Sequence, residues 1–145
     1  MTRWLEDTLL ITQLASTLPL IGLIWTVQIV HYPLFKLVGD ETQKAYQKAH
    51  MNRITWIVGP LMLAELTAAV LLWVGAPTGF WECAGVALVG IIWASTALIQ
   101  VPCHGRLVEG FDPLAHRRLV DSNWIRTIAW TLRGGVVLVM SSGIS

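Results

Sequence analysis

The sequence predicts an all-α protein, a single integral membrane domain folded as a four-transmembrane-helix bundle with two short cytoplasmic loops that carry helical pieces. Two observations predict this fold. Of the 145 residues, 54% are hydrophobic and 13% are charged, about half the charged fraction of an ordinary soluble domain. Four apolar runs, at residues 8–32, 54–74, 83–101 and 125–140, each approach the roughly 20 residues that cross a hydrocarbon core.

The first apolar run is expected to stay in the protein as a span. Arg3 precedes it, but so do Glu6 and Asp7, and the run is longer than the apolar part of a signal peptide and lacks a small-x-small cleavage site. Proline falls inside two of the runs, at Pro19 and Pro60. Because proline removes a backbone hydrogen bond, we expect a bend in each of these two spans.

Two polar stretches, residues 35–53 and 103–123, separate the runs on one side, and a short Gly/Pro turn at residues 75–80 separates them on the other. The first stretch suits a short helix from Asp40 to Lys48 that leads into the second span, with Asp40 as its N-cap. Pro113 opens a similar helical piece through Asp121, with Asp112 as its N-cap. The turn on the other side is too short to hold a domain.

Basic residues set the expected orientation, because lysine and arginine near span ends are retained in the cytoplasm. Eight of the ten flank the two polar stretches: Lys36, Lys44, Lys48, Arg53, Arg106, Arg117, Arg118 and Arg126. We therefore expect a multi-pass protein of the inner (cytoplasmic) membrane, with both termini extracytoplasmic and lipid as its main partner. A net charge of +1 does not indicate the strongly basic surface that binds nucleic acid.

All four histidines fall on the cytoplasmic side of this topology: His31, His50, His104 and His116. Imidazole is the commonest ligand for transition metals and haem iron, and helix bundles build such sites between facing helices. One interpretation is a metal or haem site made by His31, His50 and His104. The alternative is that amphipathic imidazole rings settle at the membrane interface. His116 fits the site least, because Arg117 and Arg118 suggest a solvated face.

Aromatic and amide side chains accompany these histidines. Each span carries one tryptophan in its cytoplasmic half, and the four are Trp25, Trp56, Trp93 and Trp130. In one interpretation, their indoles enclose a flat ligand such as a quinone, a polycyclic phenol or a haem. In the other interpretation, they face lipid. Gln28 precedes His31 by three residues and Gln100 precedes His104 by four, so each amide shares a helix face with an imidazole.

Charged side chains also lie inside the apolar runs. Glu65 and Arg133 are at comparable depth in the second and fourth spans, so the two side chains could form an ion pair. In one interpretation this pair locks two helices together, and in the other Glu65 carries a proton and Arg133 stabilises its charged form. On the fourth span, Asn123, Arg126 and Trp130 follow the same helical rhythm as Arg133 and form a polar stripe. Such a stripe lines a pocket or satisfies other buried polar groups.

Three short motifs carry a resemblance to a known family. They are the segment from Gln28 to Phe35 with its proline, the Val101-Pro102 pair that ends the third span, and Asn123-Trp124-Ile125-Arg126-Thr127 opening the fourth. In this layout the chain resembles the anthrone oxygenase-like family of small four-span membrane proteins. The resemblance implies a four-helix bundle, oxygenation of an aromatic polyketide, and Asn123 and Arg126 as pocket residues. The chain departs from the family in carrying Cys103-His104 after Val-Pro and His31 before the first proline.

Three functional hypotheses follow. The first is a membrane oxidoreductase, an oxygenase or a quinone-linked enzyme, that acts on a hydrophobic aromatic small molecule. His31 and His104 would bind a metal or act as acid and base, while Asn123 and Arg126 orient a substrate oxygen. The second is a non-enzymatic subunit of a larger redox or transport complex or a homo-oligomer, with small residues at the helix contacts. The third is a transporter or proton path through Glu65 and Arg133.

Overall fold

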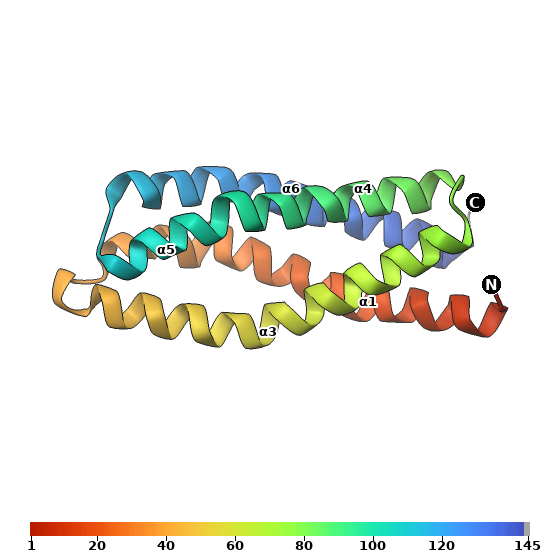
Figure 1. The fold of residues 1–145 in the computed structure, drawn as a ribbon, viewed down its shortest axis with the longest axis horizontal. Helices are drawn as coiled ribbons and strands as arrows, with labels where there is room; N and C mark the ends of the chain where they lie inside the picture. The colour runs from red at the N-terminus through yellow and green to blue at the C-terminus, as the bar shows by residue number, and fades with distance from the viewer. Residues whose placement is uncertain (144–145) are drawn as a thin grey trace.

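A computed structural model describes residues 1–143, and within that range the chain is helical and contains no strand. Four long helical stretches run alternately up and down, with short connections between them (Figure 1). The first joins α1 (Arg3–Thr26), η1 (Val27–His31), α2 (Tyr32–Leu34) and η2 (Phe35–Leu37). The others are α3 (Asp40–Gly75), α4 (Phe80–Ser95) continued by η3 (Thr96–Gln100) and α5 (Val101–Glu109), and α6 (Pro113–Ser142). The predicted all-α class is confirmed.

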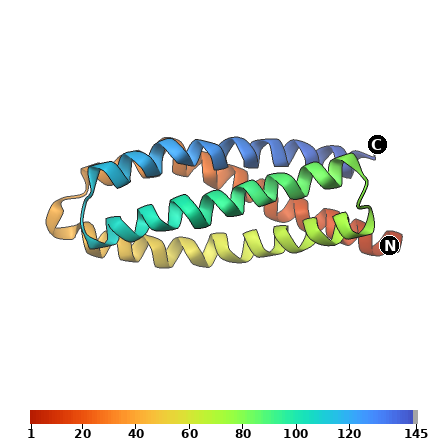
Figure 2. The ribbon, with the colours of Figure 1, turned by 45° about the horizontal axis from the view of Figure 1, so that its top comes forward.

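The four stretches form a bundle in which each packs on two neighbours. The α1 helix packs against α3 and α6, and α4 packs against the same two helices, so α1 and α4 lie diagonally across the bundle. Both ends of the described chain lie at one end of the bundle, and the connections at 38–39 and 110–112 lie at the other (Figure 2). We call the latter the polar end.

Three stretches are long and apolar enough to cross a membrane, namely Arg3–Leu37, Asp40–Gly75 and Phe80–Glu109. This supports an association with lipid. The α6 helix does not meet the same measure of length and apolarity. A span at residues 125–140 therefore does not follow from hydropathy alone.

The helical pieces predicted in the two polar stretches are present and form the beginnings of α3 and α6. The predicted helix at Asp40 is the first part of α3, which continues unbroken to Gly75, and its N-cap is Gly39 rather than Asp40. At the other connection Asp112 caps α6 as expected, because its Oδ1 accepts hydrogen bonds from the backbone N–H groups of Leu114 and Ala115. Hydropathy marks where an apolar run stops, whereas these helices extend past the ends of the apolar runs.

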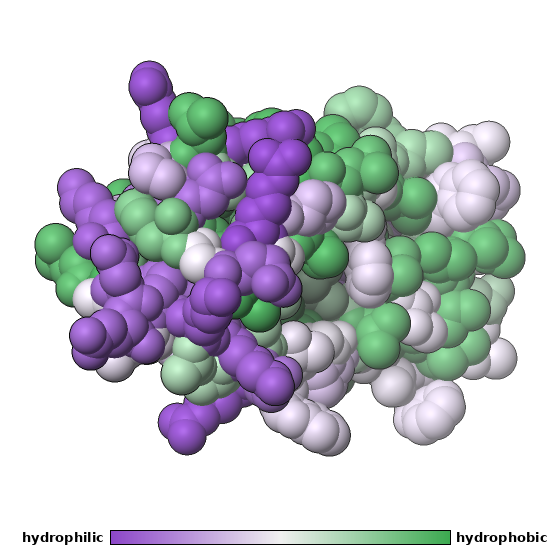
Figure 3. Space-filling model, turned by 60° about the vertical axis from the view of Figure 1, so that its left-hand side comes forward, coloured by the Kyte–Doolittle hydropathy of each residue, from purple (hydrophilic) through white to green (hydrophobic). Residues whose placement is uncertain are grey.

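The surface of the polar end is rich in basic side chains. Figure 3 shows strongly hydrophilic residues gathered there, whereas the rest of that view is a mixture of apolar residues and residues of intermediate hydropathy. The exposed lysines and arginines of this end are Lys36, Lys44, Lys48, Arg53, Arg106, Arg117 and Arg118. The distribution is typical of helices whose middle lies in lipid and whose ends reach the headgroups.

The interior of the bundle contains three apolar clusters and many buried polar side chains. An apolar cluster around Phe35, Leu107 and Leu119 lies at the polar end. A second cluster, which includes Ile92 and Trp130, lies in the middle, and a third lies near the other end. The buried polar side chains include the functional candidates, and those at the polar end contact the first cluster.

Candidate functional site

Two π-helical turns position the site residues. In η1 the Tyr32 N–H donates to the Val27 carbonyl, and in η3 the Val101 N–H donates to the Thr96 carbonyl. Each of these bonds spans five residues, and each is followed at once by a proline, Pro33 or Pro102. Because proline cannot donate to the carbonyl four residues earlier, the preceding turn is free to widen. Single π turns of this kind occur frequently at functional sites.

The polar end gathers all four imidazoles around the ring of Phe35, which is fully buried. Ring centroids lie 5.0 Å from Phe35 for His31, 5.2 Å for His50, 6.2 Å for His104 and 6.5 Å for His116. His31 Nε2 and His50 Nδ1 are 2.9 Å apart and share a hydrogen bond. The His50 and His104 rings lie 5.5 Å apart. The predicted trio of imidazoles is thus one contiguous cluster.

Tyr32 links this cluster to α6 and was not identified from the sequence. Its hydroxyl lies 2.9 Å from His104 Nε2, and its backbone carbonyl lies 2.8 Å from His116 Nε2. His116 is therefore buried, and its prediction as part of a solvated face is wrong. Its helix face, which it shares with Leu119 and Asn123, decides its position more than the adjacent arginines do.

An amide network holds Arg126 beside the cluster. Asn123 Nδ2 donates to Gln28 Oε1 at 2.9 Å, and Arg126 Nη1 donates to Asn123 Oδ1 at 3.3 Å. Gln28 Nε2 in turn donates to the Val120 carbonyl at 3.2 Å. Asn123 is fully buried and Arg126 nearly so. Gln28, predicted as a cofactor-binding residue, thus holds Asn123, which in turn holds Arg126.

A cavity of about 280 Å³ lies between α3 and the α4–η3 stretch and ends at this cluster. We call it the α3–α4 cavity. Its walls are apolar for most of their length, with Ile54, Val58, Met62 and Trp93 among them. Its polar lining includes Tyr32, Gln100, His104 and Arg126. The volume is close to that of the smaller ligand pockets of proteins, which begin at roughly 300 Å³.

Three polar atoms that belong to lining residues of the α3–α4 cavity have no protein partner. They are Gln100 Oε1, His104 Nδ1 and Arg126 Nε, and all three are buried. Gln100 uses its Nε2 to donate to the Ser122 hydroxyl at 3.0 Å, so only its carbonyl oxygen is free. Buried polar atoms are normally hydrogen-bonded, so three unpartnered ones among the lining residues mark this end of the cavity as its polar end.

The imidazole cluster does not form a set of three metal ligands. Within residues 1–143 no group of three or more histidine, cysteine, aspartate or glutamate side chains is arranged to share one ion. His31 and His50 bond to each other, and His104 bonds to Tyr32. The geometry is that of two hydrogen-bonded pairs, His31–His50 and Tyr32–His104, with the His50 and His104 rings 5.5 Å apart, and imidazoles placed in this way suit acid and base chemistry.

The four tryptophans do not surround a common ligand. Trp93 lines the α3–α4 cavity, whereas Trp130 is part of the apolar middle layer with 1% exposure. Trp56 is 82% exposed on the outer surface. Trp25 is 40% exposed and its indole N–H donates to the Thr131 hydroxyl. The positions of the four tryptophans in the sequence predicted a similar depth in the bundle, but they did not determine the direction in which each ring faces.

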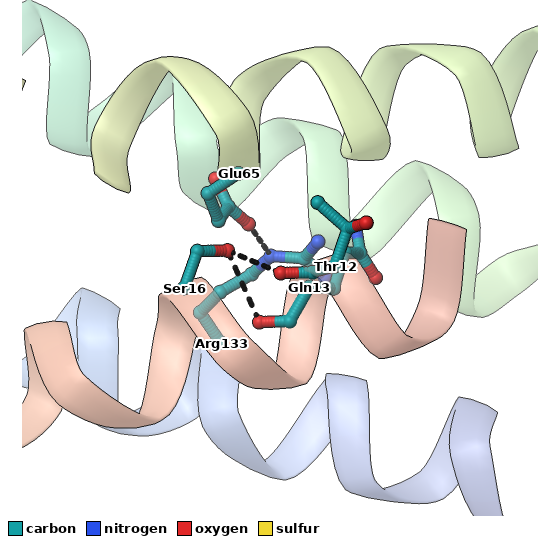
Figure 4. A network of polar contacts seen from close by, with 5 residues as sticks. All are labelled: Thr12, Gln13, Ser16, Glu65 and Arg133. Carbon is teal, nitrogen blue, oxygen red and sulfur yellow. Dashed lines mark hydrogen bonds and ion pairs between the residues drawn. The ribbon is translucent and has the colours of Figure 1, made fainter. Parts of the chain in front are cut away.

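A second polar centre lies deeper in the bundle, where Arg133 Nε and Glu65 Oε1 are 2.6 Å apart with side-chain exposures of 1% and 0%. Figure 4 shows this ion pair beside Gln13 and Ser16 of α1. Glu65 Oε2 and both Nη atoms of Arg133 have no protein partner. Neither residue lines the α3–α4 cavity. The pair joins α3 to α6, with Gly85 of α4 close to the guanidinium.

The fold and the site together define an all-helical, lipid-compatible bundle with a polar site at one end of its interior. No family model, curated protein or solved structure matches the chain significantly. Function is therefore argued from the site.

Proposed function

We propose that the protein is a membrane oxygenase that binds a hydrophobic hydroxylated aromatic molecule in the α3–α4 cavity and oxidises it with O₂. One observation carries the proposal. An apolar cavity ends at a buried imidazole, a phenol and a guanidinium, those of His104, Tyr32 and Arg126. The apolar walls suit a fused-ring substrate, and the polar end suits its oxygen atoms. The sequence resemblance to anthrone oxygenase-like proteins favours the same chemistry.

The proposal places α6 in the membrane as a fourth span. Its low hydropathy comes partly from Asn123, Arg126 and Arg133, which are buried inside the bundle. The exposed residues of α6 after Asp121 carry no charge: Trp124, Ile125, Ile128, Thr131, Leu132, Gly135, Leu138, Ser141 and Ser142. This uncharged face covers about 27 Å at 1.5 Å per residue, close to the thickness of a hydrocarbon core.

The proposed orientation puts the polar end in the cytoplasm and both termini outside, in the inner membrane. The exposed basic residues of the polar end support it through the retention of lysine and arginine in the cytoplasm. The α3–α4 cavity then lies near the cytoplasmic headgroups. A lipid-dissolved substrate would enter it sideways between α3 and α4.

The reaction converts one ring methylene and one O₂ into one ketone and one water. A base removes a methylene proton, the carbanion transfers one electron to O₂, and the two radicals combine to form the C–O bond. The peroxide takes up a proton, and a base then removes the remaining C–H proton as the O–O bond breaks. Hydroxide leaves and takes up a proton to become water.

His104 is the proposed base. In the tautomer whose Nε2–H donates to the Tyr32 hydroxyl, Nδ1 presents a lone pair with no protein partner. Arg126 would stabilise the negative charge that develops on the substrate oxygen, because a fixed cation in an apolar site lowers the energy of such a charge. His50 lies beside His104, with the two rings 5.5 Å apart, and is hydrogen-bonded to His31.

Oxygen uptake by purified protein with an anthrone as the probe substrate tests the proposal. His104→Gln keeps a hydrogen-bonding side chain but cannot accept a proton, so the rate should fall at least about a hundredfold. His116→Gln is the matched control, since His116 donates its hydrogen bond to the Tyr32 carbonyl and does not line the α3–α4 cavity. Equal rates in parent and His104→Gln would overturn the proposal. A stoichiometric metal whose removal abolishes uptake would overturn the role of His104 as a base that acts without a metal.

A further inference from the structure

A groove of about 200 Å³ lies between α5 and α6 at the polar end and shares no lining residue with the α3–α4 cavity. We call it the α5–α6 groove. Its floor is formed by apolar side chains and by the buried Cys103. Two exposed arginines, Arg106 from α5 and Arg118 from α6, complete the lining. The groove thus combines two cations with an apolar surface.

Neither arginine is neutralised by a neighbouring carboxylate. Within residues 1–143 the ion pairs are Arg117 with Asp121 and Arg133 with Glu65. Asp112, the acidic group at the start of α6, is engaged in capping two backbone N–H groups. Glu109 lies one turn after Arg106 and forms no ion pair with it. The two guanidinium groups are therefore free to bind an anion.

The apolar part of the groove extends from these charges towards the middle of the bundle. Leu98, which lines it, is 72% exposed, and Ile99 lies beside it. Leu98 precedes Arg106 by eight residues, which corresponds to about 12 Å of helix. An occupant must therefore be anionic at one end and apolar over a distance of this order.

We propose that the α5–α6 groove binds one anionic phospholipid. Its phosphate lies between Arg106 and Arg118, where two guanidinium groups form charge-assisted hydrogen bonds with the phosphate oxygens. One acyl chain lies along Leu98 and Ile99. Basic pockets between membrane helices near the cytoplasmic surface favour anionic headgroups for this reason. The proposal rests on the membrane placement of the bundle and is independent of the oxygenation chemistry.

Native mass spectrometry of the full chain in mild detergent tests this site with two probes, phosphatidylglycerol and phosphatidylcholine of the same acyl chains. The parent should retain one phosphatidylglycerol with at least about tenfold higher affinity than phosphatidylcholine. The double substitution Arg106→Gln, Arg118→Gln should remove this preference. Arg117→Gln is the matched control, because Arg117 is on the same helix but is paired with Asp121, and it should keep the preference.

The outcomes separate the alternatives. Equal affinity of the parent for the two lipids would overturn the proposal without use of any variant. Loss of the preference in Arg117→Gln to the same degree would show a general effect of surface charge and would also overturn it. Competition by inorganic phosphate at equal concentration would identify a site for the free anion rather than for a lipid. Helical content measured by circular dichroism shows whether the double variant is folded.

Discussion

Removal of one partner of the Glu65–Arg133 ion pair should destabilise the bundle strongly. The carboxylate and guanidinium are 2.6 Å apart and almost completely buried, so Glu65→Gln leaves the charge of Arg133 without its counterion. Breaking a buried pair from one side costs about 3–5 kcal/mol of unfolding free energy. Arg133→Met should cost a similar amount, because it leaves the carboxylate alone.

The double variant Glu65→Gln, Arg133→Met should recover a large part of this loss. No charge then remains in the interior, so we expect a coupling energy of about 2 kcal/mol or more. The assay is reversible unfolding of the four proteins in mixed micelles, followed by circular dichroism. Additive losses, with a coupling energy below about 0.5 kcal/mol, would refute the inferred pairing.

Three other predictions concern packing and the network behind the site. Phe35→Ala removes the ring that contacts all four imidazoles and should cost about 3–5 kcal/mol, measured by the same unfolding assay; a loss below about 1 kcal/mol would contradict this packing. Asn123→Ala removes the link between Gln28 and Arg126, so the KM for the aromatic substrate should rise while the helical content stays the same. An unchanged KM would show that Arg126 needs no such support. Gly85→Ala places a methyl group 2.6 Å from Nη1 of Arg133 and should cost about 1–3 kcal/mol, whereas the same change at Gly90, which has open space, should cost little.

The fold class was predictable because helix length and apolarity are local properties of the sequence. Three of the four stretches stand out by hydropathy alone. The fourth does not, because Arg126 and Arg133 lower its hydropathy although both side chains are buried in the bundle. Hydropathy weighs interior and exterior residues equally, whereas lipid contacts only the exterior ones.

The composition of the site was predictable in part. The alternating direction of the helical stretches brings His31, His50 and His104 to one end, and the structure places them in one cluster. Tyr32 was missed, although it adjoins His31 and precedes the proline that follows the π turn. A sequence pattern does not reveal that a π turn rotates the following side chains relative to an α-helix.

Side-chain direction was the least predictable property. For Trp25 and Trp56 the sequence left open whether the rings enclose a ligand or face lipid, and both have large exposed surfaces. His116 was assigned to a solvated face because of its charged neighbours and is instead bonded to the Tyr32 carbonyl. Sequence position sets the depth of a residue along its helix, whereas the direction of its side chain depends on the packing of the other helices.

Photoaffinity labelling tests most directly whether the α3–α4 cavity is the aromatic binding site. A benzophenone probe, activated in protein reconstituted in lipid, should label Met51 and Met62, which line the cavity, and an excess of an anthraquinone should suppress that labelling. Labelling confined to outward-facing residues such as Trp56, or labelling of the two methionines that the anthraquinone does not reduce, would contradict the proposed site.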